Sequence, residues 1–207
     1  MAELEPDFSE ERANEFNFEL FLENTQIIKD KKEIDLILDK IKLLFKKSNK
    51  KFQNLKLLYS ASIDGDEAEN FHSSCDGHAP IIVLIKTKKN VTFGGYTEIP
   101  FYSTKKKKGN KDDNAFIFSI DKMRTYEVEK GTIATCNFRD YGPVFSGFEQ
   151  SNIFLSGDFF KDPGNVAQKG DRFKTTEDYE INNGEYYFYV EEMEVYEVLF
   201  KNILIIF

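Results

Sequence analysis

The chain has 207 residues, a formal net charge of −8 at pH 7 and a hydrophobic fraction of 41%, including 21 Phe and 10 Tyr. The length fits one domain with an extension or two small domains, and the apolar content suffices for a packed core, which argues against disorder throughout. The negative net charge argues against nonspecific binding of nucleic acid, because such binding requires a basic surface that contacts phosphates.

The sequence also restricts the cellular setting of the protein. No apolar run is long enough to span a bilayer, and the acidic residues 1–15 lack the basic and apolar regions of a signal peptide. The two cysteines, Cys75 and Cys136, cannot form a disulfide framework, which fits a reducing compartment. We therefore expect a cytoplasmic protein whose contact with membranes is at most peripheral.

Three segments of different character follow one another along the chain. Residues 1–15 are polar and acidic, which predicts a mobile tail. Residues 16–52 contain no Gly or Pro and predict an amphipathic helical segment, either unbroken or divided near Thr25 or Lys29-Asp30. Residues 53–207 are expected to form the main domain, a β-sandwich.

The helical segment carries an apolar stripe that must be covered. Its members recur at steps of three and four residues and comprise Ile34, Ile37, Leu38, Ile41, Leu44 and Phe45. The stripe either packs on the chain's own domain or pairs with a second copy as a short coiled coil, although a convincing coiled coil needs a longer heptad register. We expect docking on the domain, with at most a weak homodimer through residues 30–52.

Residues 64–75 predict a short helix. Asp64 or Asp66 is expected to cap its first N–H groups, and Gly77 suits the position just past its end. The side chains expected to face the core recur at helical spacing: Ala68, Phe71 and Cys75.

Two apolar runs, residues 81–85 and 91–93, flank a polar turn and predict a β-hairpin. The second run ends at Gly94 and Gly95. Adjacent glycines in a strand indicate either a bulge or the close approach of another part of the chain.

The loop at residues 104–113 is rich in lysine. It either offers a basic patch to phosphates or phospholipid headgroups, or is simply solvated. The solvated loop is favoured, because Asp112 and Asp113 partly neutralise the charge and no aromatic residue interleaves the lysines.

The rest of the sequence predicts an antiparallel β fold. Short strands are expected, with turns between them, at residues 56–61, 114–120, 125–128, 132–136, 153–155, 178–181, 185–190 and 193–199. A hairpin turn is expected at Asn183-Gly184. The predicted class is α+β: a two-sheet antiparallel β-sandwich flanked by a few helices and preceded by an N-terminal amphipathic helix. The apolar residues 202–207 are expected to dock on the chain itself or in a partner's groove.

Several stretches resemble the TLDc domain of oxidation-resistance proteins, over roughly residues 52–200. The matching blocks, in the family's order, are residues 58–62, 64–65, 71–72, 75–77, 85–87, 93–97, 114–120, 142–147 and 192–196. The resemblance assigns motif positions to Asp64, Gly65, Phe71, His72, Cys75, Asp76, Gly77, Gly94, Gly95, Gly142, Pro143 and Glu194.

The resemblance implies a two-sheet sandwich that acts as a non-enzymatic interaction module. It also implies protection against oxidative stress and a protein partner among the subunits of the V-type proton ATPase. Two stretches depart from the family pattern. Residues 146–152 replace glycines and an Asp-Leu pair, and Tyr196 stands where the family often has Trp. The binding loops are therefore expected to differ from those of relatives.

A chemical role would depend on Cys75, His72 and Asp76, since a thiol nucleophile needs a base and a group that orients it. Cys75 shares the core side of its helix with Phe71, which predicts an inert thiol. No zinc-ligand spacing and no glycine-rich phosphate loop occur, so we expect no catalytic residue, cofactor or metal. The alternative function is a thiol-dependent peroxide-reducing or hydrolytic enzyme that uses Cys75 or Cys136.

Overall fold

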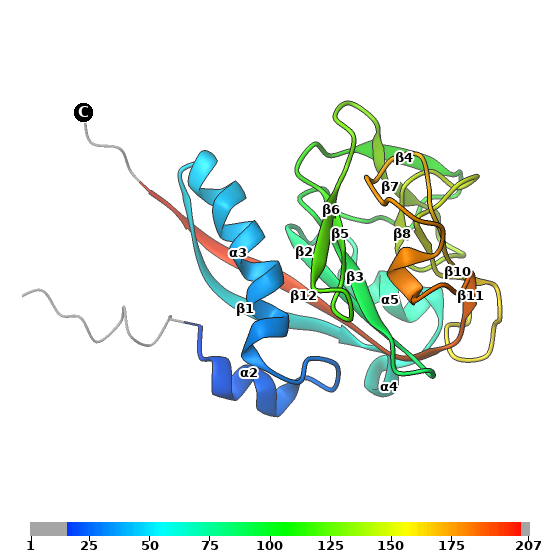
Figure 1. The fold of residues 1–207 in the computed structure, drawn as a ribbon, viewed down its shortest axis with the longest axis horizontal. Coiled ribbons are helices and arrows are strands. Elements are labelled where there is room, and N and C mark those ends of the chain that lie inside the picture. Colours follow the sequence, from blue (N-terminus) through cyan, green and yellow to red (C-terminus); the bar gives the residue numbers. More distant parts are fainter. Residues whose placement is uncertain (1–15, 204–207) are drawn as a thin grey trace, which may run out of the picture.

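The computed structural model describes residues 16–203. It contains two six-stranded antiparallel sheets, with helices around them (Figure 1). This arrangement confirms the predicted α+β class and the two-sheet sandwich. The expectations for the acidic residues 1–15 and for residues 204–207 of the apolar tail lie outside the described residues.

Both sheets combine strands that are distant in the sequence. The first sheet contains, in spatial order, β1 (Lys50–Ser60), β12 (Val190–Asn202), β2 (Ile81–Thr87), β3 (Thr92–Thr97), β5 (Phe116–Ser119) and β6 (Arg124–Glu127). The second contains β11 (Tyr187–Phe188), β10 (Asn165–Ala167), β9 (Ile153–Phe154), β8 (Val144–Phe145), β7 (Ile133–Asn137) and β4 (Lys108–Lys111). The two inner faces share one apolar core, to which Val83, Phe93, Phe145 and Ile153 belong.

The N-terminal helical segment is divided, as one of the two expectations proposed. Helix α2 (Phe18–Asn24) is followed by a connector and by α3 (Lys31–Lys47). Asp30 caps α3, because its carboxylate accepts hydrogen bonds from the N–H groups of Lys32 and Glu33. The other helices of the described residues are α4 (Ala61–Asp64), α5 (Ala68–Cys75) and the 3-10 helix η1 (Glu180–Asn182).

The apolar stripe of α3 packs on the outer face of the first sheet. Ile34, Ile37 and Ile41 are fully buried there, and they share a second core with side chains of β2, β3, β5 and β12. The chain therefore covers the stripe itself, as we expected. Pairing of residues 30–52 with a second copy stays a prediction.

The expected extension of this helix to residue 52 is wrong. The helix ends at Lys47, Asn49 adopts a positive φ of 54°, and β1 begins at Lys50. Phe52 and Leu55 continue the apolar pattern because they pack, from a strand, on the same second core as α3. The apolar pattern of the sequence therefore runs through two elements, α3 and β1, because both pack on the same core.

The region around η1 also differs from the prediction. Residues 178–181 were expected to form a strand, but Tyr179 and Asn183 have positive φ values and the chain winds into η1 between them. The Glu180 carboxylate fixes this turn by accepting hydrogen bonds from the N–H and hydroxyl groups of Thr176. The chain therefore forms the 3-10 helix η1, held by local side-chain hydrogen bonds, instead of the predicted hairpin.

The glycine pair of β3 marks a close approach rather than a bulge. β3 pairs in unbroken register with β2 and with β5. A Cβ atom on Gly94 would overlap the Val83 carbonyl and the Phe118 ring, whereas one on Gly95 would overlap the Phe145 ring. Each glycine therefore makes room on a different face of β3.

Candidate functional site

The predicted motif residues near α5 form a structural junction around His72. The Nδ1 atom of His72 lies 2.7 Å from the Asp76 carboxylate, and its Nε2 atom lies 3.1 Å and 3.0 Å from the carbonyl oxygens of Phe138 and Tyr141. The other Asp76 oxygen accepts hydrogen bonds from the Ser103 N–H and hydroxyl groups. His72 therefore ties α5 to the segment after β7, and both of its ring nitrogens are engaged.

The cysteines are not arranged for nucleophilic chemistry. Cys75 is fully buried in the sandwich core, and burial raises the pKa of its thiol far above the ordinary value. The Nε2 atom of His72 is directed at backbone carbonyls, so it is not free to act as a base. Burial also raises the pKa of the Cys136 thiol to about 11, although the Phe148 backbone and Lys107 act in the opposite direction. A thiol in this state is a poor nucleophile near neutral pH.

The remaining motif residues around α4 and α5 shape the backbone. Gly65 and Gly77 have φ values of 107° and 81°, which favour glycine. The Asp64 carboxylate accepts a hydrogen bond from the Ser60 N–H group, and the N-terminal cap of α5 is Glu67. The expectation that Asp64 or Asp66 caps this helix is therefore wrong.

The motif residues near β8 and within α5 serve the core. A Cβ atom on Gly142 would lie 2.5 Å from the Phe159 ring, and the neighbouring Pro143 is buried. Phe71 is fully buried and makes edge contacts with Tyr59 and Phe101. These positions support packing rather than contact with a ligand.

Glu194 of β12 holds the N-terminal helical segment on the first sheet. Its buried carboxylate accepts hydrogen bonds from the Thr25 hydroxyl at 2.6 Å, the Gln26 N–H at 2.6 Å and the Tyr196 hydroxyl at 2.8 Å. Burial raises the pKa of Glu194, while these three hydrogen bonds lower it. Thr25 and Gln26 belong to the connector between α2 and α3, so Glu194 acts as the anchor of that connector.

Sequence reasoning missed an aromatic cluster at the second sheet. The rings of Phe138, Tyr141, Phe148 and Phe154 form a chain of contacts with centroid distances between 4.8 Å and 6.4 Å. All four side chains are partly exposed, and none belongs to either apolar core. They come from β9 and from the loops that flank β8, so only the fold brings them together.

The lysine-rich segment lies against this cluster. The Nζ atom of Lys107 lies 4.6 Å, 5.3 Å and 6.0 Å from the ring centroids of Phe148, Tyr141 and Phe138. No aromatic residue interleaves the lysines in the sequence, but the fold brings rings from other segments to Lys107. Part of the segment, Lys108–Lys111, is also not a loop but the edge strand β4. We call Lys105, Lys106, Lys107, Lys108, Phe138, Tyr141 and Phe148 the lysine–aromatic surface.

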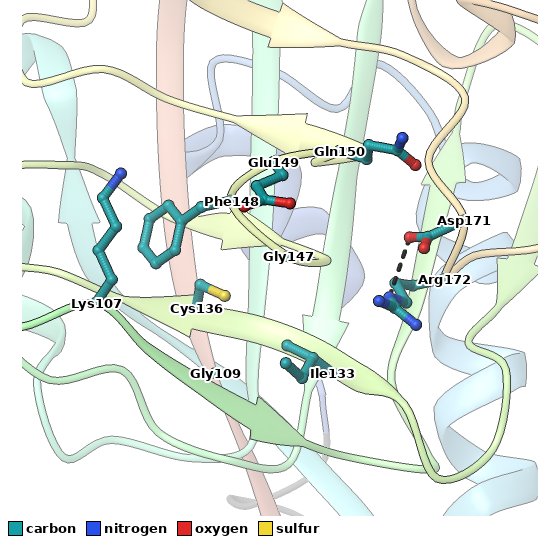
Figure 2. A pocket seen from close by; sticks show the side chains of 10 residues that line it. All are labelled: Lys107, Gly109, Ile133, Cys136, Gly147, Phe148, Glu149, Gln150, Asp171 and Arg172. Atoms are coloured by element: carbon teal, nitrogen blue, oxygen red, sulfur yellow. Dashed lines mark ion pairs between the residues drawn. The ribbon is translucent and has the colours of Figure 1, made fainter.

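A cavity of about 520 Å³ adjoins this surface. Figure 2 shows Cys136 and Ile133 on its floor, Lys107 and Phe148 at one side, and Arg172 at the other. Gly109 is paired with Cys136 across β4 and β7, and its missing side chain leaves room for Ile133, because a Cβ atom there would lie 2.7 Å from the Ile133 side chain. Arg172 is paired with Asp171 at 3.0 Å, whereas no carboxylate of the described residues lies within ion-pairing distance of Lys107.

A second cavity, of about 570 Å³, lies beside α5 and has His72, Asp76, Ser103 and Arg139 in its lining. Within residues 16–203, no group of His, Cys, Asp and Glu side chains is suited to holding a metal ion. Over the same residues, no helix has both the length and the apolar character needed to cross a bilayer.

The comparison with protein families agrees with the resemblance in the sequence. The chain matches the TLDc domain family over residues 21–199, a range that includes α3 and all strands except the last three residues of β12. The chain belongs to the TLDc domain family. A comparison with curated proteins found no match.

Proposed function

We propose that this chain is a non-enzymatic interaction module of the TLDc type. The observation that carries the proposal is the family match over residues 21–199, which spans almost the entire described fold. The state of the reactive groups supports it. Cys75 is fully buried, and both ring nitrogens of His72 are already engaged by Asp76 and by backbone carbonyls.

The partner that we propose is the V-type proton ATPase of endomembranes, together with a role in protection against oxidative stress. The family resemblance supports this assignment. The proposal implies that the protein acts on the cytoplasmic side, in peripheral contact with the membrane at most. Among the described residues, a surface with exposed lysines and partly exposed aromatic rings supports a role in binding another protein, because aromatic residues dominate many interfaces.

Purified protein tests this proposal directly. Immobilised chain is incubated with cell lysate, and bound proton-pump subunits are quantified against a bait of unrelated fold and equal net charge. In parallel, the chain is added to isolated vesicles that acidify on addition of ATP. We expect enrichment of pump subunits and a changed rate of acidification. The proposal fails if neither occurs with folded protein.

One observation favours the alternative of a thiol-dependent enzyme. Cys136 is among the residues that line the cavity, although only 3% of its surface is exposed (Figure 2). Its raised pKa argues against this alternative, because the thiolate is the nucleophile. Thiol labelling of the folded protein decides between the two functions, because only a reactive cysteine is modified quickly near neutral pH.

A further inference from the structure

The aromatic cluster lies outside both apolar cores. Each sheet contributes its inner face to the sandwich core, and α3 covers the outer face of the first sheet. Phe138, Tyr141 and Phe148 lie in neither core and keep part of their surface exposed. Partly exposed aromatic rings gathered beside a cavity are typical of sites that bind a partner.

The charge on this surface is concentrated in one short run of lysines. Residues 105–108 are four consecutive lysines in a chain of net charge −8, and all four side chains are exposed. Among residues 16–203, no carboxylate lies within ion-pairing distance of these four lysines, whereas Lys40, Lys86 and Lys89 each have an acidic partner. The surface therefore has strong complementarity to negative charge.

Residues 146–152, which depart from the family pattern, supply part of this surface. Phe148 belongs to that stretch, and its ring lies nearest to the Lys107 ammonium group. Figure 2 shows Phe148 between Lys107 and the open cavity. The Phe148 ring therefore lies between the lysine side chains and the floor of the cavity.

We propose that the lysine–aromatic surface binds an acidic, extended segment of a partner protein. Carboxylates of the segment pair with Lys105, Lys106 and Lys108, and an aromatic or aliphatic side chain enters the cavity between Phe148 and Ile133. This inference rests on the proposed function, since it names the chemistry of the partner that an interaction module of this type binds.

The shape of the site favours a peptide over a membrane. A cavity of about 520 Å³ can hold a side chain, whereas a lipid surface meets protruding apolar groups rather than a hollow. Glu149 also lines the cavity, with no cationic partner among the described residues, so the acidic part of the segment must lie toward the lysines. The bound segment therefore has one orientation, with its carboxylates at the lysines and its apolar side chain in the cavity.

The probe is a fluorescein-labelled synthetic peptide that is rich in glutamate and has one central phenylalanine, and its binding is followed by fluorescence polarisation. Two matched peptides replace either all glutamates by glutamine or the phenylalanine by serine. Both replacements are expected to weaken binding by ~10-fold or more, and added salt should weaken binding of the parent peptide.

The protein variants separate this site from general charge. Lys106→Glu combined with Lys107→Glu is expected to raise Kd by ~10-fold or more. The control is Lys122→Glu with Lys130→Glu, which makes the same change in net charge on exposed turns and should alter Kd by less than ~3-fold. Phe148→Ala should weaken binding of the phenylalanine peptide but not binding of its serine analogue. Glu149→Gln should strengthen binding of the parent peptide. Melting curves verify that each variant is folded.

Each contrary result overturns the inference in a recognisable way. If the peptide does not bind, or if the control variant loses as much affinity as the Lys106→Glu, Lys107→Glu variant, the proposed site is wrong. Binding to vesicles that contain phosphatidylserine, without binding to the peptide, assigns the surface to membranes. A wild-type dimer that Lys106→Glu with Lys107→Glu dissociates assigns it to a second copy. If the peptide fails while wild type and this variant both still capture pump subunits, only the inference falls and the proposed function stands.

Discussion

Gly95 of β3 lies directly against the ring of Phe145 of β8, and a Cβ atom built on this glycine would overlap the ring. β3 and β8 belong to different sheets, so this contact sets how closely the two sheets approach each other. Phe145 also touches Phe101 and Phe173 in the same core, which leaves its ring little room to move away.

Gly95→Val is therefore expected to destabilise the fold by about 1–3 kcal/mol, because overpacking a filled core forces side chains out of their rotamers. Thermal unfolding should show a melting temperature lowered by several degrees. Gly147→Ala is the control, since a Cβ atom there meets no atom within 4 Å. An unchanged melting curve for Gly95→Val would contradict the role assigned to this glycine.

The glycine pair and the helical stripe show how much of the fold the sequence could predict. Gly94-Gly95 indicated either a bulge or a close approach, and the structure shows the close approach. The spacing of Ile34, Ile37 and Ile41 predicted the buried side of α3. Both signals are local. The strand predicted at residues 178–181 failed because Glu180 makes side-chain hydrogen bonds that no periodicity reveals.

The lysine–aromatic surface could not be predicted, since its lysines and rings come from separate segments. Lys107 precedes β4, whereas Phe138 and Phe148 flank the short strand β8. The pairing of β4 with β7 places them together. A lysine run in the sequence therefore indicated only charge, and the aromatic content of residues 138–148 was the one available hint.

Ile37→Asp combined with Ile41→Asp should unfold or strongly destabilise the domain. Both side chains are fully buried between α3 and the first sheet, and burying an unpaired carboxylate is costly. Leu43→Asp on the same helix is the control, because Leu43 is 60% exposed. Light scattering and thermal unfolding distinguish the outcomes. A stable wild-type dimer that becomes an equally stable monomer in the double variant would show that a second chain covers the stripe.

Glu194→Ala should loosen the connector between α2 and α3. The variant leaves the partly buried Thr25 hydroxyl and Gln26 N–H without their acceptor. An unpaired donor costs about 1–3 kcal/mol when fully buried and less where water reaches it. We expect faster hydrogen exchange at Gln26 and a lower melting temperature. Glu191→Ala, which removes an exposed ion pair with Lys86, should change stability by less than about 1 kcal/mol. Equal exchange at Gln26 in wild type and Glu194→Ala would rule out the anchoring role.

Glu194 should also make stability depend on pH. Burial raises its pKa in the folded state above the unfolded value, so the folded protein holds this proton more tightly. The contribution of Glu194 to stability therefore rises as the pH falls from about 7 to about 5. The Glu194→Gln variant lacks the titrating carboxyl group and serves as the reference. Chemical denaturation at both pH values gives the free energy of unfolding of wild type and of Glu194→Gln. Wild type should gain stability relative to the variant when the pH is lowered. A difference that stays constant, or changes in the other direction, contradicts this assignment.

Neither cysteine should react quickly with a thiol reagent in the folded protein near neutral pH. Cys75 is fully buried, and the pKa of Cys136 is raised to about 11, so labelling of Cys136 should accelerate as the pH rises toward that value. Denatured protein provides the fully reactive control. Cys75→Ala should keep any protective activity in cells, apart from a packing cost. Rapid labelling at neutral pH, or loss of protection in a folded and abundant Cys75→Ala protein, would favour the enzyme.

The position of β12 between β1 and β2 has a consequence for synthesis on the ribosome. β1 is made early, yet its strand partner in the first sheet is β12, which is translated only after both faces of the sandwich core have largely been made. Such non-local pairing is slow to form. Until residues 190–202 emerge, β1 presents open hydrogen-bonding groups and the apolar side chains of Phe52 and Leu55 to other nascent chains. A messenger that stops before β12 would therefore produce a protein with an open sheet edge, prone to aggregate.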